Sequence, residues 1–227
     1  MITRPAVLLA GATGLVGGLA LQRWLAKADG PLVVAPVRRP LALTHPRLLA
    51  LPGGWDEAGI QDALESQGAR LLAYACCLGT TISKAGSREA FLEVDRDLVL
   101  ALAGVAQRLG ARQALLVSSV GASAQSGNFY LRVKGEAERG LSSLGFERVD
   151  YLRPGLLLGE REDRRAAEAL GQKIAPLANL LARGPLRRYR AIAAADVAAA
   201  LVNLCGRGGE GRHVHEYAAL MAAAGRD

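Results

Sequence analysis

Three glycines near the N-terminus constrain the fold more than any other feature of the chain. Gly11, Gly14 and Gly17 directly follow an apolar run, residues 6–10, and stand at the start of a segment with helical spacing, residues 15–28. In such a strand–turn–helix unit the first glycine permits the tight turn, the second lets a phosphate approach the backbone, and the third allows close packing of helix on strand. The free amides at the start of the helix attract anions. The pattern predicts a dinucleotide-binding turn; a glycine-rich turn without a ligand is the alternative.

Beyond this turn, short apolar runs alternate with longer helical stretches, which is typical of βαβ units and a parallel sheet. Further strands are expected at 32–37, 47–51, 70–77, 114–120, 149–152 and 212–217, and helices at 89–109, 128–144 and 196–205. The pattern loosens across residues 156–190, which we interpret as a small C-terminal segment that covers the substrate. Because no repeat or linker interrupts the chain, we predict one α/β domain over residues 1–227, a Rossmann-type doubly wound parallel sheet.

Composition narrows the class of protein. Of the 227 residues, 51% are hydrophobic and 22% charged, as in a globular protein and unlike a disordered one. A net charge of +7 favours anionic partners. No basic run is interleaved with aromatic residues, and no run is long and apolar enough for a membrane span, so we expect neither nucleic acid nor membrane as a partner.

Cysteine and histidine usage bears on compartment and metals. The chain has three cysteines, Cys76, Cys77 and Cys205. An odd number argues against a disulfide framework and favours buried thiols in a reducing compartment. The first 21 residues superficially resemble a signal peptide, but glycines interrupt them, so a cytoplasmic protein is expected. His213 and His215 alternate in an expected strand without further ligands at suitable spacing, and no metal site is expected.

The end of the second expected strand bears on which dinucleotide binds. Proteins specific for NAD commonly place a carboxylate there, whereas arginine accommodates the 2′-phosphate of NADP. Here the sequence runs Val37-Arg38-Arg39-Pro40, and two guanidinium groups can bind a phosphate through several donors. The sequence therefore predicts NADP(H) as the cofactor; a solvated loop is the alternative.

A serine, a tyrosine and a lysine form the candidate catalytic set. Ser119 lies at the end of the strand expected at 114–120, and Tyr130 and Lys134 are four apart on one face of the following helix. Hydride delivery to a carbonyl builds negative charge on its oxygen, which requires a proton donor. An ammonium beside a phenol favours phenolate, and a serine hydroxyl can stabilise the substrate oxygen. The set predicts carbonyl reduction; an ordinary surface pair on a helix is the alternative.

Several stretches of the chain resemble the atypical short-chain dehydrogenases/reductases, in the branch of the HIV Tat-interacting protein oxidoreductase. They are GATGLVG, VRR, CCLGTTISKAGSREAFLEVDRD, SSVGA, NFYLRVKGEAE and YLRPGLLLGEREDRR, which together span residues 6 to about 165. The resemblance implies a Rossmann fold, NADP(H) binding and catalysis by Ser119, Tyr130 and Lys134, with Lys134 also contacting the nicotinamide ribose. It further implies that Gly79 and Pro154 line the cofactor cleft.

The residues expected to bind the cofactor, from motif and resemblance together, are Gly11, Thr13, Gly14, Leu15, Gly17, Arg38, Arg39, Gly79 and Pro154. Two departures from the family's pattern limit the comparison. Relatives often carry an aspartate near the adenine where this chain reads Leu51-Pro52-Gly53-Gly54. Where many have a helical asparagine this chain has Asp95, so a proton relay through that position is not expected.

The favoured function is an NADPH-dependent oxidoreductase that reduces a carbonyl of an unidentified small substrate. The alternative is an NADP(H)-binding regulatory or protein-interaction protein with little turnover, which would not need a proton donor. Epimerisation with a tightly held cofactor is less favoured because the substrate segment is short. The sequence leaves a homodimer open.

Overall fold

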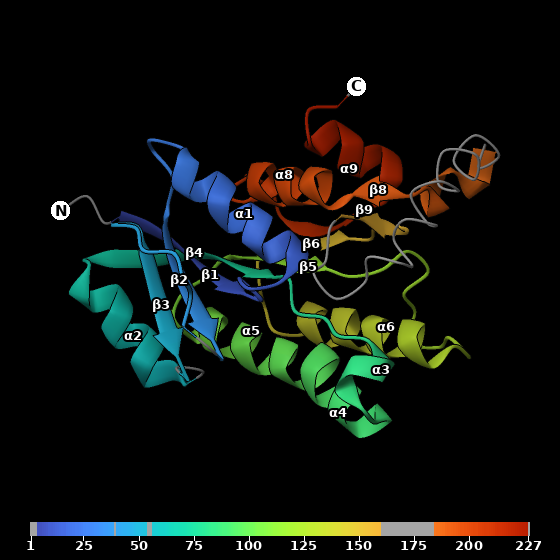
Figure 1. Ribbon diagram of the computed structural model, residues 1–227, viewed down its shortest axis with the longest axis horizontal. Coiled ribbons are helices and arrows are strands. Elements are labelled where there is room, and N and C mark those ends of the chain that lie inside the picture. Colours follow the sequence, from blue (N-terminus) through green and yellow to red (C-terminus); the bar gives the residue numbers. More distant parts are fainter. Residues whose placement is uncertain (1–3, 39, 54–55, 160–183, 227) are drawn as a thin grey trace.

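A computed structural model describes residues 4–38, 40–53, 56–159 and 184–226 (Figure 1). Seven parallel strands form one sheet in the order β3-β2-β1-β4-β5-β6-β9. The strands are β1 (Arg4–Ala10), β2 (Leu32–Val37), β3 (Leu48–Pro52), β4 (Ala69–Cys76), β5 (Gln113–Val117), β6 (Arg148–Leu152) and β9 (Gly211–His215). The predicted α/β class and doubly wound parallel sheet are confirmed.

Helices cover both faces of this sheet (Figure 1). One face carries α1 (Leu15–Ala26), α8 (Ala194–Leu204) and α9 (Tyr217–Ala223), and the other carries α2 (Glu57–Ser66), α5 (Leu98–Arg108) and α6 (Phe129–Ser142). Each layer encloses its own apolar core, built largely from Leu, Val and Ala. Two short helices, α3 (Ile82–Ala85) and α4 (Arg88–Leu92), lead into the second layer.

The centre of the sheet explains where a ligand can bind. In β1 the five residues from Ala6 to Ala10 are fully buried, because side chains alternate between the two cores: Val7 and Leu9 face α1 and α8, and Leu8 faces α2 and α5. The chain runs outward from β1 to β2 and β3, then returns to the other side of β1 as β4. Ligands of such sheets bind at this switch point, beyond the carboxyl ends of the strands.

Several predicted elements have different bounds in the structure; the strand expected at 212–217, for example, ends at His215, and Tyr217 begins α9. The helix expected at 89–109 is divided by a π-helical turn, Glu93–Asp97, between α4 and α5. The strand expected at 114–120 ends at Val117, so the serines that follow lie in a loop. Helices α2 and α9 were not anticipated from the sequence at all; α2 is capped by Asp56, whose carboxylate accepts from the amide of Gly59 at 2.8 Å.

The segment interpreted as a substrate cover, residues 156–190, is described only at its ends. It begins with the short strand β7 (Leu157–Leu158), which pairs in parallel with β8 (Ile192–Ala193), and it closes with the 3-10 helix η2 (Gly184–Tyr189). Residues 160–183 lie outside the described residues, so the covering role and the single-domain organisation stay predictions.

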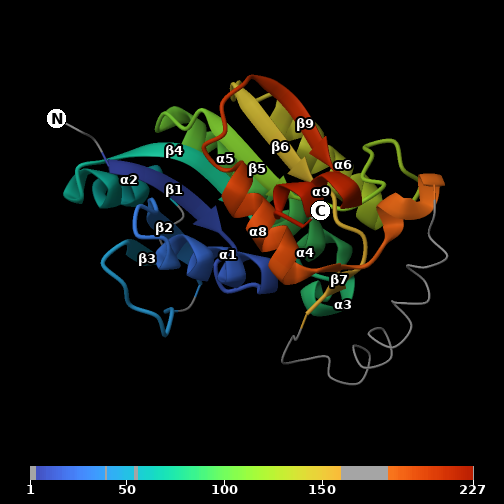
Figure 2. The same ribbon diagram turned by 90° about the horizontal axis from the view of Figure 1, so that it is seen from above.

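A polar cluster joins the last two strands of the sheet, which run side by side in Figure 2. Asp150 is fully buried and accepts hydrogen bonds from Arg148, from Gln113 at 2.7 Å and from His215 at 2.8 Å. The His215 imidazole is therefore bound by a carboxylate, and its ring also stacks on that of His213. Within the described residues, no group of three or more His, Cys, Asp or Glu side chains could hold a metal ion.

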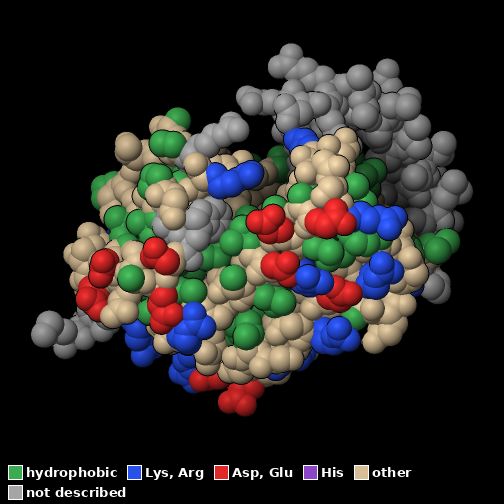
Figure 3. All heavy atoms as spheres, turned by 90° about the horizontal axis from the view of Figure 1, so that it is seen from below, with side chains coloured by type: hydrophobic (Ala, Val, Ile, Leu, Met, Phe, Trp, Pro, Cys, Tyr) green, Lys and Arg blue, Asp and Glu red, His purple; other side chains and the backbone are tan. Residues whose placement is uncertain are grey.

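The outer surface of the α2–α5–α6 layer carries charges of both signs (Figure 3). Arg96 Nη1 lies 3.1 Å from Glu136 Oε2 of α6, and Arg108 Nε of α5 lies 2.8 Å from Glu57 Oε2 of α2. Solvated pairs of this kind each contribute little to stability. Across the residues that the structure describes, no helix has both the length and the apolar character required to cross a membrane.

The close packing of α1 on the glycine turn leads to a prediction. A Cβ at Gly17 would lie 2.1 Å from the carbonyl oxygen of Gly11, whereas a Cβ at Gly18, one residue along the same helix, would meet nothing closer than Ala12 O at 3.4 Å. Gly17→Ala should therefore lower the free energy of unfolding by about 1–3 kcal/mol through overpacking. Gly18→Ala should be neutral or stabilising by up to about 1 kcal/mol, since alanine favours helix. Urea unfolding of both variants tests this, and equal effects would contradict the packing described.

Candidate active site

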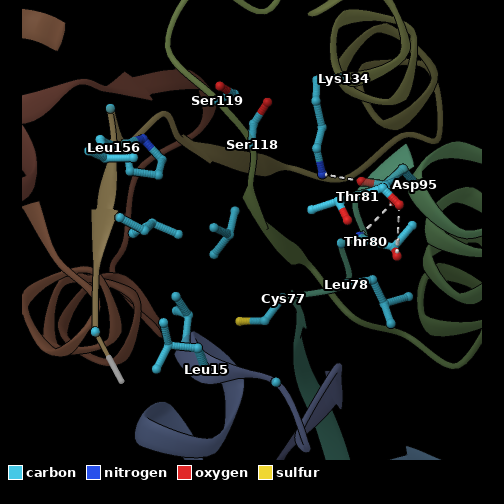
Figure 4. A pocket seen from close by; sticks show the side chains of 18 of the residues that line it. Leu15, Cys77, Leu78, Thr80, Thr81, Asp95, Ser118, Ser119, Lys134 and Leu156 are labelled. Carbon is cyan, nitrogen blue, oxygen red and sulfur yellow. Dashed lines mark hydrogen bonds and ion pairs between the residues drawn. The ribbon is translucent and has the colours of Figure 1, made fainter. Parts of the chain in front are cut away.

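A cavity of about 450 Å³ opens at the carboxyl ends of β1, β4, β5 and β6. Its walls come from the glycine turn, the loop after β4, the end of β5, one face of α6 and the stretch after β6 (Figure 4). The lining residues are Gly14, Leu15, Val16, Cys77, Leu78, Gly79, Thr80, Thr81, Asp95, Val117, Ser118, Ser119, Tyr130, Lys134, Pro154, Gly155, Leu156, Leu157, Leu158 and Gly159.

The glycine turn forms one wall of this cavity. Gly11 has a φ of +85°, a conformation that favours glycine, and a Cβ there would lie 2.7 Å from the carbonyl of Cys77. The Gly11 carbonyl accepts from the amide of Gly14 at 2.9 Å. Helix α1 then starts at Leu15 without any side-chain cap. The amides of its first turn lack partners within the helix, and they remain available to an anion.

Two serines follow β5 on a loop that is tied to β6. The amide of Ser118 donates to Leu152 O at 2.8 Å, and that of Val120 donates to Pro154 O at 3.0 Å. Ser119 lines the cavity, and its hydroxyl makes only a long contact, 3.4 Å, with Val120 O. Ser118 also lines the cavity, and its buried hydroxyl has no hydrogen-bond partner among the described residues. A buried polar atom of this kind calls for a ligand group or a water.

Helix α6 brings the tyrosine and the lysine to the same cavity. Asn128 caps the helix by accepting from the amide of Leu131 at 3.1 Å. A Cβ at Gly135 would lie 2.1 Å from the backbone of Ser123, so α6 packs tightly against the serine loop. Tyr130 and Lys134 both line the cavity, as expected for residues four apart on one helix face. The ring of Tyr130 packs against the buried ring of Phe91 from α4, with centroids 5.9 Å apart.

The lysine forms a buried ion pair. Lys134 is 4% exposed and Asp95 fully buried, and Nζ lies 2.7 Å from Oδ1. The other oxygen, Oδ2, accepts from the amide of Thr80 at 2.9 Å. Burial by itself would lower the pKa of Lys134, but the charge of Asp95, followed by that of Tyr130, outweighs burial and raises this pKa above its usual value. The lysine is therefore held as an ammonium.

Seven of the residues predicted from sequence surround this cavity: Gly14, Leu15, Gly79, Ser119, Tyr130, Lys134 and Pro154. Gly11 and Gly17 lie behind the turn and shape it without lining the cavity. Thr13 and Arg38 are exposed and also lie outside the lining. Arg39 is outside the described residues.

Sequence reasoning missed the buried acid and the second serine. Asp95 was noted only as a departure from an asparagine, and Ser118 was passed over in favour of its neighbour. One signal was present: the apolar stripe of Phe91, Leu98 and Leu102 runs through position 95, so a carboxylate interrupts a buried helix face.

One cysteine, Cys77, lines the cavity. The Cys77 side chain points into the cavity (Figure 4), next to the glycine turn. Burial raises its pKa well above the usual value, and the neighbouring Cys76 raises it further. Since the thiolate is the nucleophile, Cys77 is not suited to nucleophilic chemistry. Cys76, Cys77 and Cys205 are all free thiols.

Two relatives show the extent of the sequence similarity. It is 36% identical over 186 residues to the protein FMP52, mitochondrial, of Eremothecium gossypii, a match that covers 82% of this chain and 79% of that protein. It is also 46% identical over 98 residues to the protein HTATIP2 of Rattus norvegicus, but that match spans only 43% of this chain and 40% of HTATIP2. No protein-family model matches the chain.

Solved structures share the fold at low sequence identity. The structure of MoeE5 in complex with UDP-glucose and NAD superposes with a TM-score of 0.65 at 18% identity, over 92% of this chain and 74% of MoeE5. At this identity the likeness concerns the fold alone.

The expected cytoplasmic location is wrong by this comparison, because the FMP52 relatives are mitochondrial proteins by name. Reduced thiols and the lack of a long apolar run, on which the expectation rested, do not distinguish the cytoplasm from a mitochondrial compartment.

The identity and coverage of the FMP52 match, together with the Rossmann-like sheet, agree with the resemblance drawn from the motifs. The chain belongs to the family of FMP52 and HTATIP2, an atypical branch of the short-chain dehydrogenases/reductases.

Proposed function

We propose that this protein is an NADP(H)-dependent oxidoreductase that reduces the carbonyl group of a small, uncharged substrate. The observation that carries the proposal is the meeting of Tyr130, a charged Lys134 and the uncapped start of α1 in one cavity. A tyrosine and lysine on an ordinary surface of a helix would not share a cavity with a phosphate-binding turn.

Features of the cavity fit a nicotinamide dinucleotide. The backbone cradle at Gly11, Gly14 and Gly17 has no space for added side chains at its first and last positions, where a Cβ would lie under 3.0 Å from backbone atoms. Such a cradle brings amides directly to a diphosphate. The buried Ser118 hydroxyl, which lacks a partner in the described part of the chain, offers a further hydrogen bond inside the cavity.

Tyr130, Lys134 and Ser119 have different roles in the proposed reduction. When bound, the cofactor supplies the hydride. Tyr130 donates its hydroxyl proton to the carbonyl oxygen, and the nearby Lys134 ammonium stabilises the phenolate that remains. The Ser119 hydroxyl, which has only a long internal contact, donates a hydrogen bond to the same oxygen and orients the substrate.

The charge of the cavity favours a neutral substrate. Among the described lining residues only Asp95 and Lys134 are charged, and they neutralise each other. The wall after β6 is apolar, and Leu156 in it is 59% exposed. MoeE5 has been solved with UDP-glucose. A substrate of that class would bring a diphosphate for which no unpaired cation lines this cavity, within the residues described.

Arg38 supports NADP(H) over NAD(H). It follows β2, which pairs with β1, so it lies at the same edge of the sheet as the glycine turn. It is exposed, and no carboxylate stands beside it in sequence. An arginine at this edge can bind a 2′-phosphate through charge-assisted hydrogen bonds.

Removal of the tyrosine hydroxyl tests the proton-donor role. Tyr130→Phe should lower kcat/KM for NADPH-linked reduction by about 10²–10⁴-fold, the usual contribution of general acid catalysis, and should leave NADPH affinity nearly unchanged. Tyr217→Phe, in α9 and outside both the cavity and the segment 156–190, is the matched control and should behave as the parent. The assay is NADPH oxidation with a panel of neutral aldehydes, ketones and quinones.

Two results of that assay would overturn the proposal. Undiminished turnover in Tyr130→Phe would remove the proton donor. A parent protein that binds NADPH tightly yet reduces no member of the panel would instead support a regulatory role.

Arg38→Ala tests the choice of cofactor. Loss of a hydrogen bond to a charged group costs about 1.5–3 kcal/mol, so the variant should bind NADPH at least about tenfold more weakly, with NADH affinity unchanged. Arg23→Ala, an exposed arginine of α1, is the control. Calorimetric titration measures the affinities of the parent and of both variants for NADPH and NADH, and equal binding of the two cofactors by the parent would refute 2′-phosphate recognition.

A further inference from the structure

Asp95 occupies a position that a helix would ordinarily give to an apolar side chain. It lies in the π-helical turn Glu93–Asp97, between α4 and α5, and is fully buried. Its neighbours Arg96 and Asp97 pair with each other at the surface. Single π-turns inside helices frequently occur at functional sites. A buried carboxylate is costly unless it is paired, so this placement depends on its partners.

The partners of Asp95 come from two other elements of the cavity. One oxygen contacts Nζ of Lys134 on α6, at 2.7 Å, and the other accepts from the amide of Thr80 after β4, at 2.9 Å (Figure 4). Gly79 lies directly against the pair: a Cβ there would be 3.6 Å from both Asp95 Oδ1 and Lys134 Nζ. The carboxylate therefore ties α6 to the loop that forms the opposite wall of the cavity.

We propose that Asp95 is a positioning residue of this site: its carboxylate fixes the Lys134 ammonium against the loop at Gly79 and Thr80 and keeps it charged beside Tyr130. The catalytic meaning of this role rests on the proposed function. The ion pair itself can be tested without cofactor or substrate.

The charge of Asp95, rather than its shape, is what this role requires. Stability alone does not demand a buried ion pair, because apolar residues of similar volume often serve as well. An asparagine could equally accept from the Thr80 amide. The negative charge of Asp95 is the largest of the effects that oppose burial at Lys134, and those of Tyr130 on α6 and Cys76 on β4 are smaller. Without that charge, the effect of burial is opposed less, and the ammonium loses its proton at lower pH.

Asp95→Asn separates the charge from the hydrogen bond to Thr80. Trace acylation of the full-length protein, with a small reagent that attacks only the neutral amine, is followed at Lys134 by peptide mass spectrometry across a pH series. The labelling midpoint of Lys134 should fall by about one pH unit or more, which is roughly a tenfold gain in labelling at a fixed pH below the midpoint. Asp97→Asn, in the same turn but paired with Arg96, should leave the midpoint unchanged.

The outcomes are distinct. An unchanged Lys134 midpoint in a folded Asp95→Asn variant would make the pair purely structural and overturn the proposal. If the variant does not fold, the parent still decides: Lys134 must label at higher pH than the exposed Lys27 in the same samples, and the reverse order refutes the proposal. Failure to find any reducible carbonyl would contradict the proposed function, but it would not affect the labelling result.

Where a carbonyl substrate is found, a second readout applies. The limb of the pH–rate profile that reports loss of the proton from Lys134 should move to lower pH in Asp95→Asn, because removal of the neighbouring negative charge eases that loss. A lower rate with an unmoved limb would indicate disturbed structure only, and would count against the proposal.

Discussion

Direct packing of three backbone segments, at Gly11, Gly17 and Cys77, is the constraint on which the candidate site depends. Helix α1 lies so close to the glycine turn that a Cβ at Gly17 would overlap the Gly11 carbonyl, and a Cβ at Gly11 would lie 2.7 Å from the carbonyl of Cys77, just after β4. No side chains separate these segments, so α1 begins directly at the edge of the sheet. No side chain caps its first amides. The same closeness places the loop after β4, with Gly79 and Thr80, opposite the serines that follow β5. The cavity thus follows from glycine geometry at the switch point of the sheet.

Two buried carboxylates show how differently this fold uses charge. Asp150 lies on β6, next to β9. Burial raises its pKa, but hydrogen bonds from His215, Arg148 and Gln113 outweigh burial and lower the pKa to about 2. It joins strands and lines no described cavity. Asp95 has fewer partners, lies in an irregular helical turn and faces the cavity. Although the chain carries a net charge of +7, the described lining of its cavity is close to neutral, because its lysine is paired.

Periodicity and turn chemistry predicted the parts of the structure that are locally determined. The strand, glycine turn and helix from Arg4 to Ala26 were read nearly to the residue, because three glycines and an apolar run leave few alternatives. The pairing of Tyr130 with Lys134 followed from helical spacing and the Asn128 cap. The π-turn at Asp95 was not predicted, since the apolar stripe continues on either side of it and its carboxylate pairs with Lys134, 39 positions away in sequence. The predicted cytoplasmic location was wrong because amino-acid composition does not determine the compartment.

Three observations support a dinucleotide bound across the switch point of the sheet. They are membership of the FMP52 and HTATIP2 family, the uncapped start of α1, and a buried ammonium beside a phenol. A crystal structure of the protein grown with NADPH tests this account most directly. The account predicts the diphosphate on the backbone amides at Leu15 and Val16, in the first turn of α1, and the nicotinamide ring in the cavity facing the Tyr130 hydroxyl. Coenzyme bound elsewhere, or a phenol turned away from the ring, would contradict it.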